Sequence, residues 1–298
     1  MKKALAIDVG GTKIYSAIVN EAGEIVSDIE KHSTPKTFEE IRALFEDIIS
    51  RYEADVDVVS FATCGAVNNT NDGILGSTGN IVSDYPKMDF RSLTKKPVFV
   101  ENDANCAAWA EHVIGASKGM AYSVMLTLGT GVGGGIILDN KLYKGKSGAA
   151  GEMHFKMRTH RHRKCTCGSY DCFEAYASGN GLRQTAVEVS GESGITTYDV
   201  IENKDRPIMK KILEIWQNDI LQGIIGLQNI FDADCIVLSG SMAEFADVEY
   251  LEREANKEIV TTSFVVRKAT AGNYSGMIGA GLLGLDRHLV SGKWKVES

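Results

Sequence analysis

The feature that most constrains the fold is a pattern that occurs twice: an apolar strand, a glycine-rich turn and a second apolar strand. The first copy spans residues 4–19, where ALAID leads through VGGTK into IYSAIV. The second spans residues 123–140, SVMLTLGTGVGGGIILDN. Short apolar runs bounded by glycine are typical of buried strands. The repeat therefore predicts an α/β chain with two similar halves, a duplicated fold.

The glycine turns also suggest a binding function. Residues 129–134 match G-x-G-x-x-G, but a dinucleotide or P-loop site needs a helix directly after the glycines, and here the run GIILD predicts a strand. Two glycine hairpins can still cradle a phosphate chain, because glycine lets backbone N–H groups approach closely. Thr12, Thr127 and Thr130 add hydroxyl donors. The alternative is that both turns are ordinary tight hairpins.

A carboxylate follows a third apolar run. PVFVEND (97–103) predicts a strand that ends at Asp103, and a helix follows to about Ile114. Phosphoryl transfer to an alcohol needs phosphate donors, Mg²⁺ and a carboxylate that accepts the hydroxyl proton. We predict that Asp103 is this base; the alternative is a helix N-cap. Asp8, at the end of the first strand, is the candidate for the Mg²⁺ shell, through water.

Residues 151–174 indicate a metal site. Three cysteines in a C-x-C-x4-C spacing and three histidines lie between Gly151 and Glu174. Thiolates and imidazoles held close together suit Zn²⁺, and three thiolates with one imidazole form a closed structural site. Disulfides are the alternative, but no secretory signal supports them. We expect the ion to brace Glu152 and Glu174, which are otherwise surface charges.

Composition excludes several functions. The chain has 298 residues and a net charge of −7, which argues against a nucleic-acid or anionic-membrane partner. No apolar run approaches the roughly 20 residues of a membrane span. Thiols without a signal segment predict a cytoplasmic protein. The basic run at 160–164 is expected to be a solvated loop.

Two helices are expected in the second half. A long helix is predicted from Pro207 to about Phe231, and its apolar residues lie nearly all round it, so it should be deeply packed. Residues 276–285, rich in Gly, Ala and Leu, predict a tightly packed helix.

Five motifs in order resemble the ROK family of bacterial sugar kinases, within the actin/hexokinase-like superfamily. They are DVGGTK at 8–13, ENDANCAA at 101–108, LGTGVGGGI at 128–136, GE at 151–152 and CTCGSYDCFEAYASG at 165–179. The resemblance implies an α/β fold of two ribonuclease-H-like lobes with an ATP cleft between them. We place the lobes at 1–117 and 118–283, with a C-terminal helix at about 284–298 packing back on the first lobe. It also implies ATP, Mg²⁺, a sugar substrate and a cytoplasmic homodimer.

The resemblance assigns residues to each role. Asp103 is the general base for the sugar 6-hydroxyl. The phosphate and nucleotide contacts are Asp8, Gly10, Gly11, Thr12, Lys13, Thr130, Gly131, Gly133, Gly134 and Gly240. The sugar contacts are Gly65, Asn80, Asn102, Asp103, Glu152, His154 and Glu174. The structural zinc ligands are His154, Cys165, Cys167 and Cys172.

The chain departs from the family pattern near the metal. The family usually has Glu-x-x-His, whereas here Glu152 is followed by Met153, His154 and Phe155. We favour His154 as the fourth ligand. The alternative is that Phe155 fills its place and His160 or His162 ligates. Asp171 and Cys64 also stand where the family has glycine and proline, so the sugar side is expected to be reshaped.

These features predict an ATP-dependent kinase acting on the 6-hydroxyl of a hexose or N-acylhexosamine, of the glucokinase or N-acetylmannosamine kinase type. A fructokinase of the same family is an alternative. A sugar-responsive regulator is another, but such regulators carry a DNA-binding helix-turn-helix domain before the kinase-like part. The first strand here starts at residue 4, so no room for that domain is expected. A catalytically dead sugar sensor is the third alternative.

Overall fold

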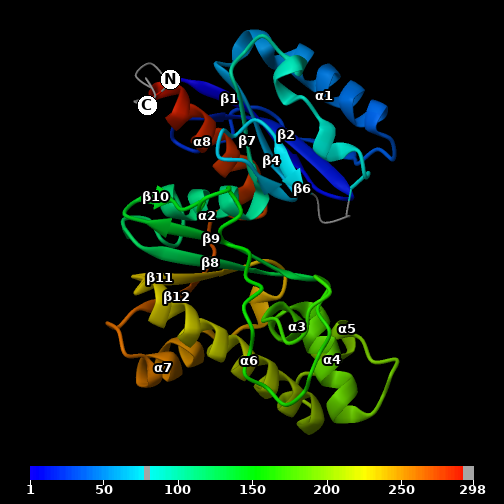
Figure 1. Ribbon diagram of the computed structural model, residues 1–298, viewed down its shortest axis with the longest axis vertical. Helices are drawn as coiled ribbons and strands as arrows, with labels where there is room; N and C mark the ends of the chain where they lie inside the picture. The colour runs from blue at the N-terminus through cyan, green and yellow to red at the C-terminus, as the bar shows by residue number, and fades with distance from the viewer. Residues whose placement is uncertain (77–80, 291–298) are drawn as a thin grey trace. The chain divides into compact units, whose positions relative to one another are not determined.

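The computed structural model describes residues 1–76 and 81–290, with the side chains of 287–290 excepted. The chain forms two compact units (Figure 1). Unit 1 contains Met1–Gly119, Leu142–Ala150 and the chain from Thr270 onward. Unit 2 contains Met120–Lys141 and Gly151–Ala269. Residues 142–150 and 270–283 thus belong to unit 1, although we expected 118–283 to form one continuous lobe.

A five-stranded sheet forms the centre of unit 1, in the order β3-β2-β1-β4-β7. Its strands are β1 (Lys3–Val9), β2 (Lys13–Asn20), β3 (Glu30–Ser33), β4 (Val58–Thr63) and β7 (Val98–Asn102). β1 pairs antiparallel with β2 and parallel with β4, and β4 pairs parallel with β7. The carboxyl ends of β1, β4 and β7 therefore lie at one edge of the sheet. A small ribbon, β5 (Ala66–Val67) and β6 (Ile74–Gly76), follows β4.

Helices cover this sheet. They are α1 (Phe38–Tyr52), α2 (Asp103–Val113) and α8 (Ser275–Val290), with short 3₁₀ turns at Glu53–Asp55, Tyr85–Lys87 and Phe90–Leu93. α8 packs against α2, β1 and β4. The close fit that we predicted for 276–285 is present, since a Cβ on Gly279 would lie 1.7 Å from the carbonyl oxygen of Cys106 in α2. Only glycine permits this approach of the two helices.

Unit 2 repeats the plan of unit 1. Its sheet has the order β10-β9-β8-β11-β12. The strands are β8 (Ser123–Leu128), β9 (Val132–Leu138), β10 (Lys141–Leu142), β11 (Cys235–Ser239) and β12 (Val265–Lys268). β8 pairs antiparallel with β9 and parallel with β11, as β1 does with β2 and β4. The predicted duplication is confirmed by this shared order, and a strand follows each glycine turn, as predicted.

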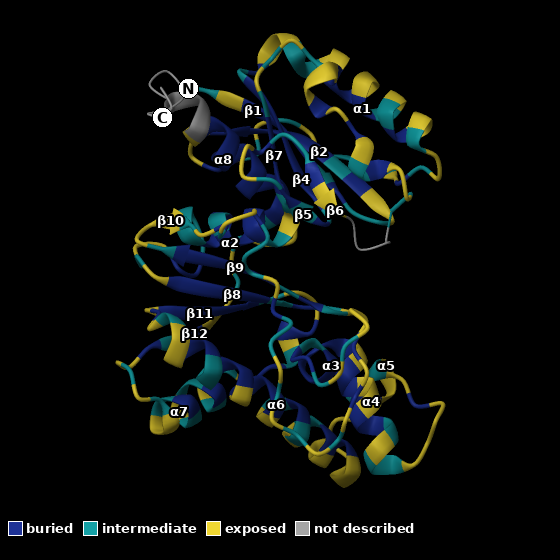
Figure 2. Cartoon of the chain, in the orientation of Figure 1, coloured by how far each residue is buried: buried dark blue, intermediate teal, exposed yellow. Residues whose placement is uncertain are grey.

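The helices of unit 2 are α3 (Glu174–Ala177), α4 (Gly179–Ser190), α5 (Thr197–Glu202), α6 (Pro207–Phe231) and α7 (Val248–Glu258), with a 3₁₀ turn at Ala243–Phe245. Figure 2 shows the inner strands of both sheets mostly buried and the outer faces of the helices exposed. α6 has the predicted ends, and Ile212, Trp216 and Ile220 are fully buried. The predicted deep packing is present along the middle of the helix, whereas Ile208 and Ile230 near its ends are exposed.

Among the described residues, no helix combines the length and the apolar character that crossing a bilayer requires.

Candidate functional site

Two carboxylates meet at the carboxyl edge of the unit 1 sheet. Val9 at the end of β1 pairs with Thr63 of β4, which pairs with Asn102 of β7. This register brings Asp8 and Asp103 to the same edge. Asp103 is exposed in the first turn of α2, whereas Asp8 is half-buried beside Gly276 of α8. Burial, together with the charge of Asp103, raises the pKa of Asp8 to about 7.

The thiol of Cys64 shares this edge. Burial, with the charges of Asp103 and then Asp8, raises its pKa to about 11. Gly65 follows with a φ of +93°, and its carbonyl accepts a hydrogen bond from Nδ2 of Asn102 at 3.1 Å. The turn after β4 is therefore held against the start of α2. Asn80, the sugar contact predicted nearby, lies outside the described residues.

Asn102, and not Asp103, is the N-cap of α2. Its Oδ1 accepts hydrogen bonds from the N–H groups of Ala104 and Asn105 at 2.9 and 3.1 Å. Asp103 is the first helical residue, so the alternative in which it serves as the cap does not apply. Its carboxylate accepts the N–H of Ala104 at 2.9 Å and remains exposed. An exposed carboxylate at the edge of a sheet can accept a proton from a bound alcohol.

Glu101, a residue that the sequence analysis did not single out, is fully buried directly before the cap. Lys144, which is 7% exposed, contacts it at 2.8 Å. The available signal was an acid inside the apolar run PVFVEND, because a buried charge requires a partner.

The first glycine turn is a tight hairpin between β1 and β2. The N–H of Gly10 donates to the carbonyl of Lys13 at 3.0 Å. Thr34, directly after β3, adds two bonds, from its N–H to the Thr12 carbonyl at 3.1 Å and from its hydroxyl to the Gly10 carbonyl at 2.6 Å. Thr12 and Lys13 remain exposed at the tip. The turn is thus rigid and open to solvent, and the half-exposed Gly11 lies within it.

The second turn is shorter than the motif that predicted it. Only residues 129–131 form the turn, closed by the N–H of Gly129 donating to the Gly131 carbonyl at 3.0 Å. Gly133 and Gly134 pair with β8 inside strand β9. Gly134 is buried, and a Cβ there would lie 2.5 Å from the Met153 side chain, so its small size serves packing. Thr130 and Gly131 are the turn residues of the predicted set.

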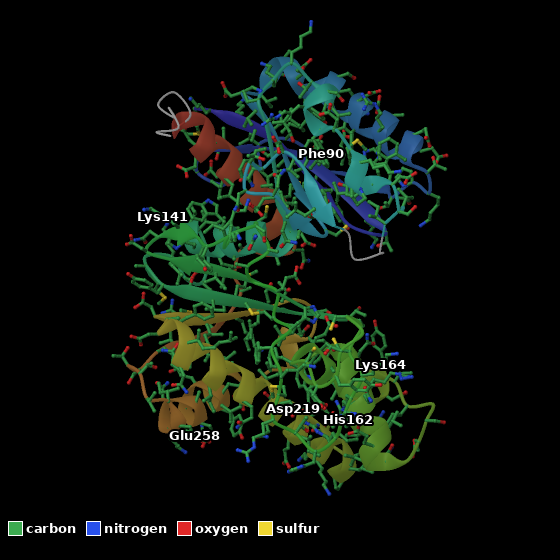
Figure 3. All side chains as sticks on the ribbon, viewed as in Figure 1. Phe90, Lys141, His162, Lys164, Asp219 and Glu258 are labelled. Atoms are coloured by element: carbon green, nitrogen blue, oxygen red, sulfur yellow. The ribbon has the colours of Figure 1, made fainter. Side chains whose placement is uncertain are left out.

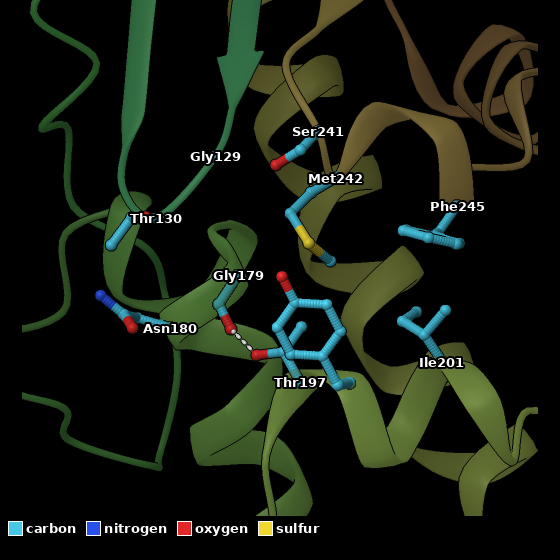
Figure 4. A pocket seen from close by; sticks show the side chains of 10 residues that line it. Gly129, Thr130, Gly179, Asn180, Thr197, Ile201, Ser241, Met242 and Phe245 are labelled. Carbon is cyan, nitrogen blue, oxygen red and sulfur yellow. Dashed lines mark hydrogen bonds between the residues drawn. The ribbon is translucent and has the colours of Figure 1, made fainter. Parts of the chain in front are cut away.

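A pocket of about 240 Å³ opens beside this second turn in unit 2 (Figure 4). Its lining comes from four segments: Gly129, Thr130, Gly179, Asn180, Thr197, Tyr198, Ile201, Ser241, Met242 and Phe245. The N–H of Gly179 at the start of α4 donates to the Gly129 carbonyl at 2.8 Å, and the Thr197 hydroxyl donates to the Gly179 carbonyl at 3.0 Å. The N-terminus of α4, whose partial positive charge suits an anion, therefore lies beside the glycine turn.

Gly240, predicted as a nucleotide contact, does not line this pocket but lies directly before the lining residues Ser241 and Met242. Its φ is +87°, and a Cβ there would lie 2.4 Å from the Leu128 carbonyl. The same carbonyl accepts the N–H of Met242 at 2.9 Å. Gly240 thus lets β11 turn sharply, so that Ser241 and Met242 reach the pocket wall. The α5 and Phe245 contributions carry no recognisable motif and were missed.

The four predicted metal ligands gather in one place. The ligand atoms of His154, Cys165, Cys167 and Cys172 all lie within 4.8 Å of one another. Sγ of Cys165 lies 3.7 Å from Nδ1 of His154, and the Cys167 and Cys172 sulfurs are 3.6 Å apart. A tetrahedral zinc ion with Zn–S near 2.3 Å and Zn–N near 2.0 Å sets its ligand atoms roughly 3.5–3.8 Å apart. The donor set and its spacing therefore fit Zn²⁺.

Phe155 and His162, the residues named in the alternative for the metal site, have other contacts. The ring of Phe155 stacks on that of Phe173, with centroids 4.9 Å apart. His162 stacks on Tyr170 and lies 3.3 Å from Asp171. Asp171 has a φ of +58°, the conformation for which the family uses glycine. It is held there by hydrogen bonds from the Arg163 N–H at 2.8 Å and the Tyr176 hydroxyl at 2.5 Å.

The two glutamates that flank the metal ligands differ in setting. Glu152 is exposed, and its carboxylate lies 3.8 Å from Nε2 of His154, on the opposite side of the ring from the sulfurs. Glu174 instead accepts the N–H of Val132 at 3.1 Å and a hydroxyl bond from Thr166. Glu174 therefore links the metal segment to the second glycine turn.

The basic run at 160–164 is not a solvated loop, so that expectation was wrong. Arg163 is 1% exposed and forms an ion pair with Glu188 on α4 at 2.6 Å. Arg161 forms an ion pair with Asp219 on α6. Both guanidinium groups lie over the Tyr176 ring, at 4.5 and 4.7 Å. Figure 3 labels Asp219 on α6 and His162 and Lys164 on this run, of which Lys164 is exposed. The arginines anchor the metal segment to the helices.

Comparison with known proteins places this arrangement in a family. The ROK family model matches residues 4–287. The chain belongs to the ROK family. The actin/hexokinase-like α/β fold that the motifs implied is thereby confirmed. A ROK hexokinase from Thermus thermophilus superposes with a TM-score of 0.84 at 27% identity, over 97% of this chain and 99% of that chain.

Two ROK relatives with assigned names are similar over nearly the whole chain. A glucokinase from Streptomyces coelicolor is 30% identical over 94% of this chain and 96% of its own length. An N-acetylmannosamine kinase from Yersinia pseudotuberculosis is 31% identical over 95% and 98%. A ROK glucokinase from Streptomyces griseus, solved with glucose and AMPPNP, superposes with a TM-score of 0.77 at 28% identity, over 95% of this chain and 99% of that chain.

Proposed function

We propose that this ROK protein is an ATP-dependent sugar kinase that phosphorylates the 6-hydroxyl of a hexose or N-acylhexosamine. The observation that carries the proposal is the pair Asp8 and Asp103 at one sheet edge, one half-buried and the other exposed at the start of a helix. Relatives named glucokinase and N-acetylmannosamine kinase at 30% and 31% identity support it. The proposal therefore includes both acceptor classes.

Asp103 is the proposed general base. Its carboxylate is exposed and is held at the first turn of α2 by the Asn102 cap. It would accept the proton of the sugar 6-hydroxyl as that oxygen attacks the terminal phosphorus of ATP. Asp8 suits the shell of Mg²⁺, because carboxylate oxygens are the donors that this ion prefers and a cation would offset two nearby negative charges. Magnesium, when bound, neutralises charge on the transferred phosphoryl group.

The nucleotide is proposed to contact two sets of residues. The first turn (Gly10, Gly11, Thr12 and Lys13) is proposed to contact the phosphates in unit 1, and its exposed residues Thr12 and Lys13 offer side-chain donors. In unit 2, Thr130, Gly131 and the start of α4 offer them beside the pocket, whose Tyr198, Ile201, Met242 and Phe245 suit an adenine ring. The AMPPNP complex of the Streptomyces griseus glucokinase supports ATP as the donor.

The sugar is proposed to contact Gly65, Asn80, Asn102, Glu152, His154 and Glu174. The imidazole of His154 presents Nδ1 to the sulfurs and Nε2 toward Glu152. A structural zinc ion bound by His154 and the three cysteines would fix this ring, and Nε2–H would then be a donor for a sugar hydroxyl.

A cytoplasmic homodimer completes the proposal. All six cysteines are free in the described part of the chain. Sedimentation velocity at micromolar concentration tests the dimer, and cell fractionation tests the location.

The deciding experiment is ADP release measured over a panel of hexoses and hexosamines, with Asp103→Asn as the test variant. We expect turnover to fall about 10²–10⁴-fold, because proton transfer is lost, while sugar binding is kept. Asp55→Asn, an exposed acid in the same unit, is the control. Unchanged turnover in Asp103→Asn would remove Asp103 as the base. Sugar binding without ADP release by the wild type would favour the sensor.

A further inference from the structure

The ion pair between Glu101 and Lys144 lies directly behind the proposed base. Glu101 is completely buried at the end of β7, two residues before Asp103, and Lys144 is 7% exposed. Their charged groups are 2.8 Å apart. Removing two charges from water is costly, so such a pair persists only when its geometry and hydrogen bonds are good.

Among the described residues, two donors to Glu101 come from the start of α2 and two come from other segments of unit 1. Oε1 accepts the N–H of Asn102 at 2.9 Å and Nδ2 of Asn105 at 3.1 Å. Oε2 accepts Nδ2 of Asn71 at 2.7 Å as well as the Lys144 ammonium. The carboxylate therefore holds residues on both sides of Asp103, which is placed between Asn102 and Asn105 in sequence.

These contacts continue into the cap itself. The Asn102 side chain, whose backbone N–H is fixed by Glu101, accepts the N–H groups of Ala104 and Asn105. Asp103 has no freedom to shift along the sheet edge unless this cap moves. The reaction rate is sensitive to the position of a catalytic group, since a displacement of about 1 Å can lower the rate roughly 100-fold.

Lys144 comes from residues 142–150, which connect β10 to Glu152. The ammonium also donates to the Asn68 carbonyl at 3.0 Å, and Nδ2 of Asn69 donates to the Lys146 carbonyl at 2.6 Å. At Gly148, with a φ of +99°, a Cβ would lie 1.9 Å from the Val67 carbonyl. The connection is thus pressed onto the β5–β6 ribbon, with the ammonium as its buried anchor.

We propose that Glu101 and Lys144 form a positioning pair that fixes the cap of α2, and with it the orientation of Asp103, for phosphoryl transfer. Both charged groups are buried, so the pair is proposed to act through the cap and not by direct contact with a substrate. This inference rests on the proposed function for its effect on rate, but its effect on the cap is independent of that function.

The test is a double-mutant cycle of Lys144→Met, Glu101→Gln and the double variant. Lys144→Met leaves a buried carboxylate without its cation, and we expect kcat to fall about 10- to 100-fold with the KM for ATP within about twofold. The double variant removes both charges, and the Glu101→Gln amide keeps one oxygen that can accept the bonds from Asn102 and Asn105. The double variant should therefore recover most of the lost kcat. Lys146→Met, an exposed lysine on the same connection, should match the wild type.

Hydrogen exchange of the peptide covering 101–107 provides a readout that does not need turnover. We expect the amides of Ala104 and Asn105 to exchange faster in Lys144→Met and to return toward the wild-type rate in the double variant. If Lys144→Met does not fold, the soluble double variant and Lys144→Arg carry the comparison, and Lys144→Arg should keep both kcat and slow exchange. Wild-type kcat and unchanged exchange in Lys144→Met would overturn the positioning role. Failure of the wild type to release ADP with any sugar would instead overturn the proposed function. The exchange data would still show whether the ion pair fixes the cap of α2.

Discussion

Asp8 and Asp103 lie at the same edge of the unit 1 sheet, close enough that the charge of Asp103 adds to burial in raising the pKa of Asp8 to about 7. In the unfolded chain Asp8 loses its proton near its ordinary value of 3.8. Between these two values the folded protein holds a proton that the unfolded chain has lost. The contribution of Asp8 to stability is therefore present below about pH 4 and is lost as the pH rises through about 7.

The first prediction follows from that difference. In buffer without Mg²⁺, the melting temperature of the wild type should fall relative to that of Asp8→Asn as the pH is raised from 5 to 8, because the variant cannot ionise. Differential scanning fluorimetry of both proteins over this range measures the effect. If the difference between the two melting temperatures were the same at every pH, the raised pKa of Asp8 would be contradicted.

The second prediction concerns the metal. We expect about one zinc ion per chain in elemental analysis, because three sulfurs and one imidazole are already spaced for it. His154→Ala and Cys167→Ser should lower the zinc content and the melting temperature. His162→Ala should keep its zinc, because His162 contacts Asp171 and Tyr170 instead. The reverse order, with His162→Ala losing the ion, would reassign the fourth ligand.

A third prediction separates two neighbouring basic residues. Arg163→Met should lower the free energy of unfolding by about 2–4 kcal/mol, because the buried carbonyls of Ala175 and Gly181 lose their donor. Lys164→Met, at the adjacent exposed position, should change it by less than about 0.5 kcal/mol. Urea denaturation measures both. Equal effects at the two positions would show that the arginine network adds nothing to stability.

The fourth prediction tests the pocket of unit 2. Tyr198 lines it and is 80% exposed, so its ring is available to cover a nucleotide base. Stacking on an aromatic ring contributes about 1–3 kcal/mol per base, so Tyr198→Ala should raise the KM for ATP about tenfold while the KM for sugar stays constant. Tyr122→Ala, a tyrosine of the same unit outside the pocket, is the matched control. A KM for ATP that does not move would place the base elsewhere.

Local pattern predicted several parts of the fold. The strands after both glycine turns were predictable, because β-branched and aliphatic residues follow the glycines without a helical period. The ends of α6 were also predictable, because Pro207 suits the first helical turn and Asp232 adopts a left-handed conformation at the C-cap. The four clustered metal ligands follow from their short spacing in the sequence.

Contacts between distant residues were not predictable in the same way. Arg163 and Lys144 stand in polar stretches, where a basic residue is exposed by default. Their partners Glu188 and Glu101 are 25 and 43 residues away, and nothing local links them. The extent of the second glycine turn was also missed, because a G-x-G-x-x-G string does not reveal that Gly134 packs against Met153.

The position of α8 at the end of the chain affects how unit 1 folds during synthesis. This helix fills the face of unit 1 formed by β1, β4 and α2, yet the ribosome synthesises it after all of unit 2. During synthesis, the apolar face of the unit 1 sheet is therefore exposed while roughly half of the chain emerges. Exposed apolar surfaces of this kind bind chaperones or aggregate. A chain that stops at residue 269 would contain every residue of unit 2 but would lack the helix that covers the core of unit 1.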